Sequence, residues 1–361
     1  MIWIHNAFET GSKEDAITKV CDNGKSIFVG DSHTDYESIK NHYVCKFVYA
    51  DYGYDKAEEY DYKISNLLEL VNILAQFEEK EEMLKGKEYR VFSMNESNIT
   101  LIDNKNGTYY FGFVNFKDNQ NDRIALEKLI EEVNRRDLYV TGPINGNTFY
   151  PYRFAIDNFE MKLYPDCNNS EETYKLFLNN GFKLKQKYVS TLARINQKIW
   201  KIAKHTKLGP GYEIKVVEGK ESFKYIDDLY SVAVDAFTRG DYYEPISKED
   251  FVNIYMKNLS MVSPDLVLVY FKGELVGFDF CYEDPEKRFY VCKTLGIKKN
   301  FQNKLIVLPL GDYSFQNMVK KGYDTILYHF QNDRTKVLEA IYKGCIIKQK
   351  YYGLLEYGNK K

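Results

Sequence analysis

Apolar and polar residues follow two different patterns along the chain, and the change comes at the charge-rich segment 78–88. Before it, short apolar runs alternate with segments whose apolar residues recur at helical spacing. The pattern predicts strands at 26–29 and 45–50 and helices at 36–42 and 65–77. Alternating strands and helices are typical of a parallel sheet with its chemistry at the carboxyl ends of the strands. The charge-rich segment itself predicts a helix end or linker, and thus a domain boundary.

Beyond this segment the pattern predicts two units built from antiparallel strands and helices, one at 85–198 and the other at 207–361. In the first unit we expect strands at 89–94, 98–104, 108–116, 137–144 and 185–194, and helices at 121–136 and 172–182. In the second we expect helices at 225–238, 303–322 and 335–344, a hairpin at 265–284, and strands at 289–297, 323–330 and 348–357. The units read as a weak duplication without any short sequence repeat. The predicted class is therefore α/β for residues 1–77 and α+β for the rest.

Composition narrows the class of partner. The net charge of the 361-residue chain is -2, which gives no reason to expect nucleic acid or an acidic membrane as the main partner. Its 32 tyrosines could stack on bases, but no basic stripe accompanies them. No apolar run approaches the roughly 18 residues needed to cross a bilayer.

The six cysteines are scattered, and several lie within apolar runs, which is typical of reduced, buried thiols in the cytosol. The five histidines form no cluster with each other or with cysteine, which argues against zinc. The first residues lack the charged-then-apolar pattern of a secretion signal. We therefore expect a cytoplasmic protein.

The sharpest local motif is Gly-Asp-Ser-x-x-Asp at the end of the strand expected at 26–29. It places two carboxylates, Asp31 and Asp35, at a strand end, where oxygen ligands suit Mg²⁺. Lys13, which precedes a helix leading into that strand, could neutralise a phosphoryl group. The alternative interpretation is an ordinary turn in which the aspartates cap the next helix.

Residues 10–76, with Lys13, this motif, the Tyr-Gly-Tyr at 52–54 and the segment 61–70, resemble the C-terminal half of haloacid-dehalogenase-type (HAD) phosphatases. The resemblance implies that Lys13 binds phosphate and that Asp31 and Asp35 hold Mg²⁺. The family also needs a nucleophilic Asp-x-Asp motif, which is missing here. We therefore predict that this polypeptide alone has no HAD phosphatase activity and carries a vestigial metal site, unless a separately encoded HAD N-terminal half completes it.

The second unit has the element order of the GNAT acyltransferase superfamily, which it resembles over about 210–357. By this resemblance 289–297 is the splayed strand that pairs with pantetheine, and the following helix holds the diphosphate of acetyl-CoA or another acyl-CoA. The residues implied in cofactor binding are Leu295, Ile297, Gln302, Asn303 and Lys304. The loop departs from the family pattern because Leu305 and Val307 stand at glycine positions, where side chains would crowd the backbone.

The candidate catalytic residues of the second unit are Tyr342, which could protonate a leaving thiolate, and Asn332, which could supply a polar contact. The alternative is that Tyr342 is one more packed tyrosine. No strong general base stands on the splayed strand, where Lys293 is the nearest ionisable group, and Glu274 and Glu244 are weaker candidates.

In the first unit, the string Gly-Pro-Ile-Asn-Gly-x-Thr-x-x-x-Tyr-Arg resembles one in the N-terminal half of certain tandem-GNAT N-acetyltransferases. Thr148, Tyr152 and Arg153 follow its turn as candidate substrate-binding residues, and Arg153 could grip a carboxylate or a phosphate. The alternative is a loop that merely ends a strand. This first unit would then be a degenerate GNAT fold.

Three functions remain open from the sequence. The first is an acyl-CoA-dependent N-acyltransferase acting on an amine of a small molecule or a cell-envelope precursor. The second is a non-catalytic binding or regulatory protein with degenerate GNAT pockets. The third is one half of a split HAD phosphatase. The sequence does not identify the acceptor, the active half or the oligomeric state.

Overall fold

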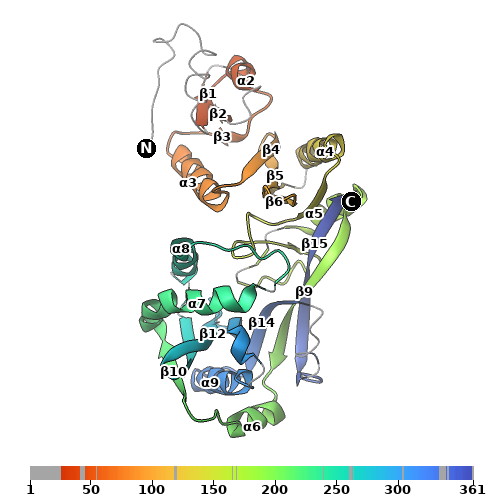
Figure 1. Ribbon diagram of the computed structural model, residues 1–361. Coiled ribbons are helices and arrows are strands. Elements are labelled where there is room, and N and C mark those ends of the chain that lie inside the picture. Colours follow the sequence, from red (N-terminus) through yellow and green to blue (C-terminus); the bar gives the residue numbers. More distant parts are fainter. Residues whose placement is uncertain are drawn as a thin grey trace.

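The computed structural model of the chain describes residues 26–40, 45–53, 55–117, 120–164, 166–167, 169–238, 240–259, 262, 264–302, 305–332, 339 and 341–359. The strands of this part form two sheets, one of three strands and one of twelve (Figure 1). The whole is a mixed α/β fold with one large sheet.

The small sheet is parallel, as the alternation of strands and helices predicts. Its strands are β1 (Ser26–Gly30), β2 (Cys45–Ala50) and β3 (Tyr62–Ile64), with helices α2 (His33–Ile39) and α3 (Glu69–Met83). Helix α3 runs through much of the charge-rich segment 78–88, so this segment is largely a helix end.

The large sheet joins both predicted units into one continuous surface. In spatial order its strands are β10 (Tyr212–Glu218), β11 (Pro264–Phe271), β12 (Glu274–Glu283), β13 (Tyr290–Ile297), β14 (Thr325–Asn332), β9 (Lys183–Arg194), β15 (Ile346–Gly358), β7 (Tyr139–Gly142), β6 (Tyr109–Asn115), β5 (Ser97–Asp103) and β4 (Glu88–Met94), with β8 (Phe154–Ala155) paired to β15. The hairpin between β11 and β12 turns at Lys272 and Gly273, both with positive φ, as a tight hairpin requires.

The helices of these units are α4 (Gln120–Arg135), α5 (Glu171–Asn179), α6 (Gln197–His205), α7 (Ile226–Phe237), α8 (Lys248–Leu259) and α9 (Val307–Lys320), with short 3₁₀ segments at Gly219–Tyr225 and Lys299–Phe301. Helix α4 shows why the periodic segments fold: Ala125, Leu126, Leu129 and Val133 form one fully buried stripe. The sequence analysis did not anticipate α6, α8, β3, β8 and β10, and most of the helix expected at 335–344 lies outside the described residues. None of the described helices has both the length and the apolar content to span a membrane.

The last strand of each unit pairs with strands of the other unit. Strand β9 ends the first unit in sequence but pairs with β14 of the second. Strand β15 ends the second unit but pairs with β7 of the first. The two also pair with each other, and Figure 1 shows them as long adjacent arrows between the two parts. This exchange fixes the two units against one another through backbone hydrogen bonds and shapes the space between them.

Candidate functional site

Strands β13 and β14 separate near their middle. They pair in parallel from Tyr290 with Ile326 to Cys292 with Tyr328, and no pairing between them continues beyond these residues in the described part. On its other side β13 remains paired with β12 as far as Ile297. The backbone of 293–296 therefore has one edge that β14 does not cover, as predicted for a splayed strand.

A β-bulge coincides with this separation. On β12, Phe280 lies opposite Thr294 and the next residue, Cys281, lies opposite Cys292, so Lys293 is the extra residue on β13. Bulges bend a strand and re-aim its side chains, and they are frequent next to active sites. Here the bulge directs Lys293 to the lining of the cavity described below.

The first unit repeats this geometry but closes it. Strands β6 and β7 pair in parallel only at Tyr109 and Tyr110. Beyond them the loop after β7 returns to the same edge: the Ile144 amide donates to the Phe111 carbonyl at 2.8 Å, and the Phe113 amide donates to Asn145 Oδ1 at 2.7 Å. The loop therefore covers the edge of β6 at a place where the corresponding edge of β13 is left uncovered by β14.

A cavity of about 1580 Å³ lies between the two units at the open edge of β13. Six of the predicted site residues line it, three from each unit: Thr148, Tyr152, Arg153, Leu295, Asn332 and Tyr342. Lys293 lines it as well, whereas the weaker base candidates Glu244 and Glu274 do not. The exchange of β9 and β15 brings these residues together from positions almost 200 residues apart.

Arg153 is the most unusual cation of the cavity. It is only 6% exposed, and its Nε and Nη1 atoms have no hydrogen-bond partner. The guanidinium carbon lies 3.7 Å, 4.2 Å and 4.3 Å from the ring centres of Tyr152, Tyr188 and Phe330. Its backbone φ is 77°, a left-handed conformation that a non-glycine residue holds at a cost. A buried guanidinium with two nitrogens that lack hydrogen-bond partners favours binding of an anion.

Lys293 faces the same part of the cavity. Its Nζ lies 5.8 Å from the centre of the Phe330 ring, which Arg153 also contacts. Burial, and then the charge of Arg153, lower the pKa of Lys293 to about 8. In the described part of the chain neither cation has an ion pair with a carboxylate at 4.0 Å or less. Two neighbouring cations without such a partner favour binding of an anionic group.

Tyr342 is almost fully buried, and its hydroxyl shares a 2.6 Å hydrogen bond with the hydroxyl of Tyr328. Burial raises the pKa of both phenols, so both keep their protons across the physiological range. Tyr342 is thus both a packed core residue and a proton-bearing group at the cavity. Asn332, at the end of β14, also lines the cavity.

The remaining cofactor candidates lie near the start of α9. Ile297 is buried in a separate apolar cluster, and the Gln302 side chain donates to the Ile297 carbonyl at 3.1 Å, so neither lines the cavity. Asn303 and Lys304 lie outside the described residues. Leu305 and Val307 are 63% and 46% exposed, and Val307 also lines the cavity.

The backbone of Leu305 has a conformation that glycine adopts more readily than leucine does, at a position where the resembled sequence pattern has glycine. Its φ is 55°, which costs an L-residue about 1–2 kcal/mol. We expect Leu305→Gly to be more stable than Leu305→Ala by about 1 kcal/mol, because both remove the exposed side chain and only glycine relieves the backbone. Urea unfolding of the two variants measures this difference, and equal stabilities would contradict the left-handed conformation.

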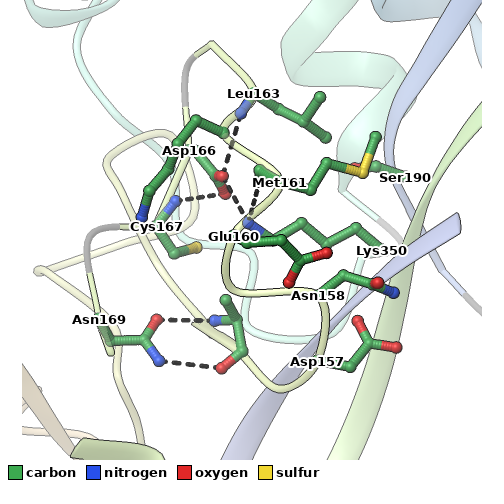
Figure 2. A network of polar contacts seen from close by, with 12 residues as sticks. Asp157, Asn158, Glu160, Met161, Leu163, Asp166, Cys167, Asn169, Ser190 and Lys350 are labelled. Atoms are coloured by element: carbon green, nitrogen blue, oxygen red, sulfur yellow. Dashed lines mark hydrogen bonds and ion pairs between the residues drawn. The ribbon is translucent and has the colours of Figure 1, made fainter. Parts of the chain in front are cut away.

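A polar network holds the loop that forms one wall of the cavity (Figure 2). Lys350 reaches from β15 to Asp166 at 2.7 Å and to the Met161 carbonyl at 2.7 Å. The Asp166 carboxylate also accepts the amides of Leu163 and Cys167, at 3.2 Å and 2.8 Å. The exchanged strand β15 therefore fixes a loop of the first unit through one buried ion pair.

The N-terminal carboxylates are engaged in local structure. Asp35 Oδ2 accepts the amides of Asp31 and Ser32 and the Ser32 hydroxyl, and Ser32 caps α2 in return. This is a capping box in which Ser32, and not an aspartate, is the N-cap, while Asp35 stands at the third position of the helix. Asp31 lies at the end of β1 against Gly53. Lys13 lies outside the described residues, so the resemblance to HAD phosphatases and its Mg²⁺ site stay predictions.

Sequence reasoning missed the aromatic cage of Arg153 and a cluster of Asp279, Cys281 and Cys292 beside the cavity. Burial raises the pKa of Asp279 to about 6. A local signal existed for the second: Asp279 and Cys281 stand two residues apart on one strand and thus share a face. The partner Cys292 is 11 positions away, and only the register of β12 and β13 brings it near.

Comparisons with known proteins concern the arrangement of elements. No protein-family model and no curated protein matches the chain. Among solved structures, a tandem GNAT protein from the clavulanic acid biosynthesis pathway is 7% identical, with 77% of this chain and 85% of that chain covered and a TM-score of 0.43. A GCN5-related N-acetyltransferase from Sphaerobacter thermophilus is 11% identical, covering 78% and 85%, at a TM-score of 0.42. L-PGS from Bacillus licheniformis is 12% identical, covering 79% and 92%, at 0.38.

Proposed function

We propose that the protein is an acyltransferase that moves an acyl group from an acyl-CoA thioester to the amine of an acceptor that also carries an anionic group. The observation that carries this proposal is the open edge of β13, at the bulge of Lys293, facing a cavity wide enough for two substrates. Unpaired backbone groups at a strand edge can pair with the amides of an extended pantetheine arm.

The second unit is the one that takes the donor in this proposal. Its β13 edge is open, whereas the loop through Ile144 and Asn145 hydrogen-bonds to the equivalent edge of β6 in the first unit. The first unit instead supplies Arg153 and Tyr152 to the acceptor side of the cavity. In this proposal the second unit is the active half, and the first unit is the supporting half.

The start of α9 fits a diphosphate only in part. No side chain caps the helix. Leu308 already donates its amide to the Leu305 carbonyl, and Pro309 has no amide hydrogen, which leaves Val307 to offer an N–H in the first turn. We therefore expect β13 to contribute more to donor affinity than the helix does.

Acyl-CoA supplies the activated thioester when bound. Arg153 and Lys293 hold the anionic group of the acceptor and so orient its amine toward the edge of β13. Backbone amides of that edge are suited to polarise the thioester carbonyl. The amine nitrogen forms the new bond to the carbonyl carbon as the carbon–sulfur bond breaks, and Tyr342 can donate a proton to the departing sulfur. Tyr328, which is hydrogen-bonded to Tyr342 and also lines the cavity, can then pass a proton to Tyr342 and take one from water in the cavity. The acceptor amine loses its proton to solvent.

Calorimetric titration of the full chain with acetyl-CoA tests donor binding. We expect one site per chain, because only one of the two splayed edges is open. No heat at high micromolar ligand would contradict donor binding, and two sites per chain would contradict closure of the first unit. A thiol-release assay with amines that differ only by a carboxylate or phosphate then tests the acceptor, and equal rates with and without the anion would overturn that part.

A further inference from the structure

The side chains of Asp279, Cys281 and Cys292 converge beside the cavity, at the bulge between β12 and β13. Cys281 and Cys292 are directly opposite in the strand register, and their sulfur atoms lie 3.3 Å apart. Asp279 is on the same face of β12 as Cys281, and its Oδ2 lies 3.9 Å from the Cys292 sulfur. One possible ligand atom from each residue lies within 4.8 Å of the other two.

Asp279 gives an independent reason to expect a ligand there. Its side chain is 97% removed from solvent, since only 3% is exposed. Oδ2 accepts a hydrogen bond from the Ser314 hydroxyl at 2.6 Å, but Oδ1 is buried without any partner. In the described part of the chain no lysine, arginine or histidine forms an ion pair with it. A buried carboxylate oxygen with no donor is costly, and a cation removes that cost.

The distances suit a tetrahedral ion. Zinc–sulfur bonds of about 2.3 Å and zinc–oxygen bonds of about 2.0 Å require the two sulfurs to be about 3.8 Å apart and sulfur and oxygen about 3.5 Å apart. The observed 3.3 Å and 3.9 Å each differ from these values by roughly half an ångström. Small side-chain rotations correct such differences.

We propose that Asp279, Cys281 and Cys292 bind one thiophilic divalent cation of the zinc class, with a fourth coordination position open to the cavity. Two thiolates and one carboxylate favour Zn²⁺ or Co²⁺ over Mg²⁺ or Ca²⁺, which prefer oxygen ligands alone. Asp279, Cys292 and Ser314 all line the cavity, so a water or a substrate atom can reach the fourth position. Three protein ligands with one open position is the pattern of catalytic rather than structural zinc.

The spacing of cysteines and histidines along the chain argues against a zinc site, because no closely spaced cysteine or histidine ligands occur in it. The ligands here are separated by a hairpin and meet across two strands. The site does not depend on acyl transfer, since it would bind metal whether or not the cavity binds acyl-CoA. Failure of one proposal therefore leaves the other standing.

The experiment is a Co²⁺ titration of the reduced, chelator-treated full chain, followed by ultraviolet and visible absorption. We expect saturation at one equivalent, with a thiolate-to-metal charge-transfer band and the intense visible bands of a tetrahedral Co²⁺ site, and displacement of both by Zn²⁺. Cys281→Ser should abolish the charge-transfer signal of the site or reduce it by about half. Asp279→Asn, which keeps the size of the side chain, should weaken binding at least tenfold and shift the visible bands.

The matched control is Cys345→Ser, which removes a free cysteine outside the cluster and should leave the titration unchanged. Circular dichroism spectra that match the parent show that each variant is folded. Absence of a charge-transfer band, a band that survives Cys281→Ser unchanged, or a band lost in Cys345→Ser would overturn the proposal.

Discussion

Lys350→Met should lower the free energy of unfolding by about 3–5 kcal/mol, the largest stability change that we expect from one substitution in this chain. The Lys350 and Asp166 side chains are 1% and 7% exposed, so their charges are almost fully removed from water. Methionine keeps the length and the packing of the side chain but leaves the Asp166 carboxylate buried opposite an apolar group. The two amides that Asp166 accepts cannot offset the lost ammonium.

Lys348→Met is the matched control on the same strand. Lys348 pairs with Glu160 at 2.8 Å, but the two side chains are 42% and 70% exposed, and such pairs contribute about 0–1 kcal/mol. Urea unfolding of both variants measures the contrast. Adding Asp166→Asn to Lys350→Met should recover part of the loss, since the uncompensated charge is then gone. Equal losses in Lys350→Met and Lys348→Met would contradict the buried pair.

Arg153→Met should raise the KM for the acceptor about 10- to 100-fold and leave the KM for acyl-CoA nearly unchanged. Charge-assisted hydrogen bonds are each worth about 1.5–3 kcal/mol, and 1.4 kcal/mol is tenfold in affinity. Methionine retains an apolar stem among Tyr152, Tyr188 and Phe330. Arg153→Lys keeps the charge but loses the planar fork, so we expect an intermediate KM.

Stability separates a binding role of Arg153 from a structural one. Two of its nitrogens are buried without partners, so replacing the guanidinium should leave the free energy of unfolding unchanged or raise it. Arg136→Met, at a residue that is partly exposed and 3.9 Å from Asp103, controls for loss of one positive charge. A large loss of stability in Arg153→Met with an unchanged acceptor KM would show that Arg153 only supports the fold.

Much of the element list could be predicted from the sequence because it depends on local patterns. The helical stripe of α4, the turn at Gly273 and the strand that becomes β13 each follow from residue spacing alone. Helices α6 and α8 were missed although they are as long as α5 and α7, which were predicted. In α6 the Asn196 side chain accepts hydrogen bonds from the amides of Lys198 and Ile199, and an asparagine before an amphipathic segment is a start signal that the sequence analysis overlooked.

The exchange of strands could not be predicted in this way, although one clue was present. The tetrapeptide Lys-Gln-Lys-Tyr occurs at 185–188 and again at 348–351, at the start of the two strands that exchange. The sequence analysis found no short repeat, and this one was overlooked. Even so, a repeat indicates that two strands are equivalent and does not say which neighbours they pair with.

The sequence by itself determined where strands and helices form and supplied the residues Arg153, Asn332 and Tyr342, because these depend on neighbours along the chain. Only the tertiary structure decided that residues of both units line one cavity, that the first splayed edge is closed by Ile144 and Asn145, and that Lys293 lies at a bulge. The physical reason is that strand pairing and register join segments far apart in sequence. Their pairing depends on burial and backbone hydrogen bonding across the whole sheet, which no local pattern encodes.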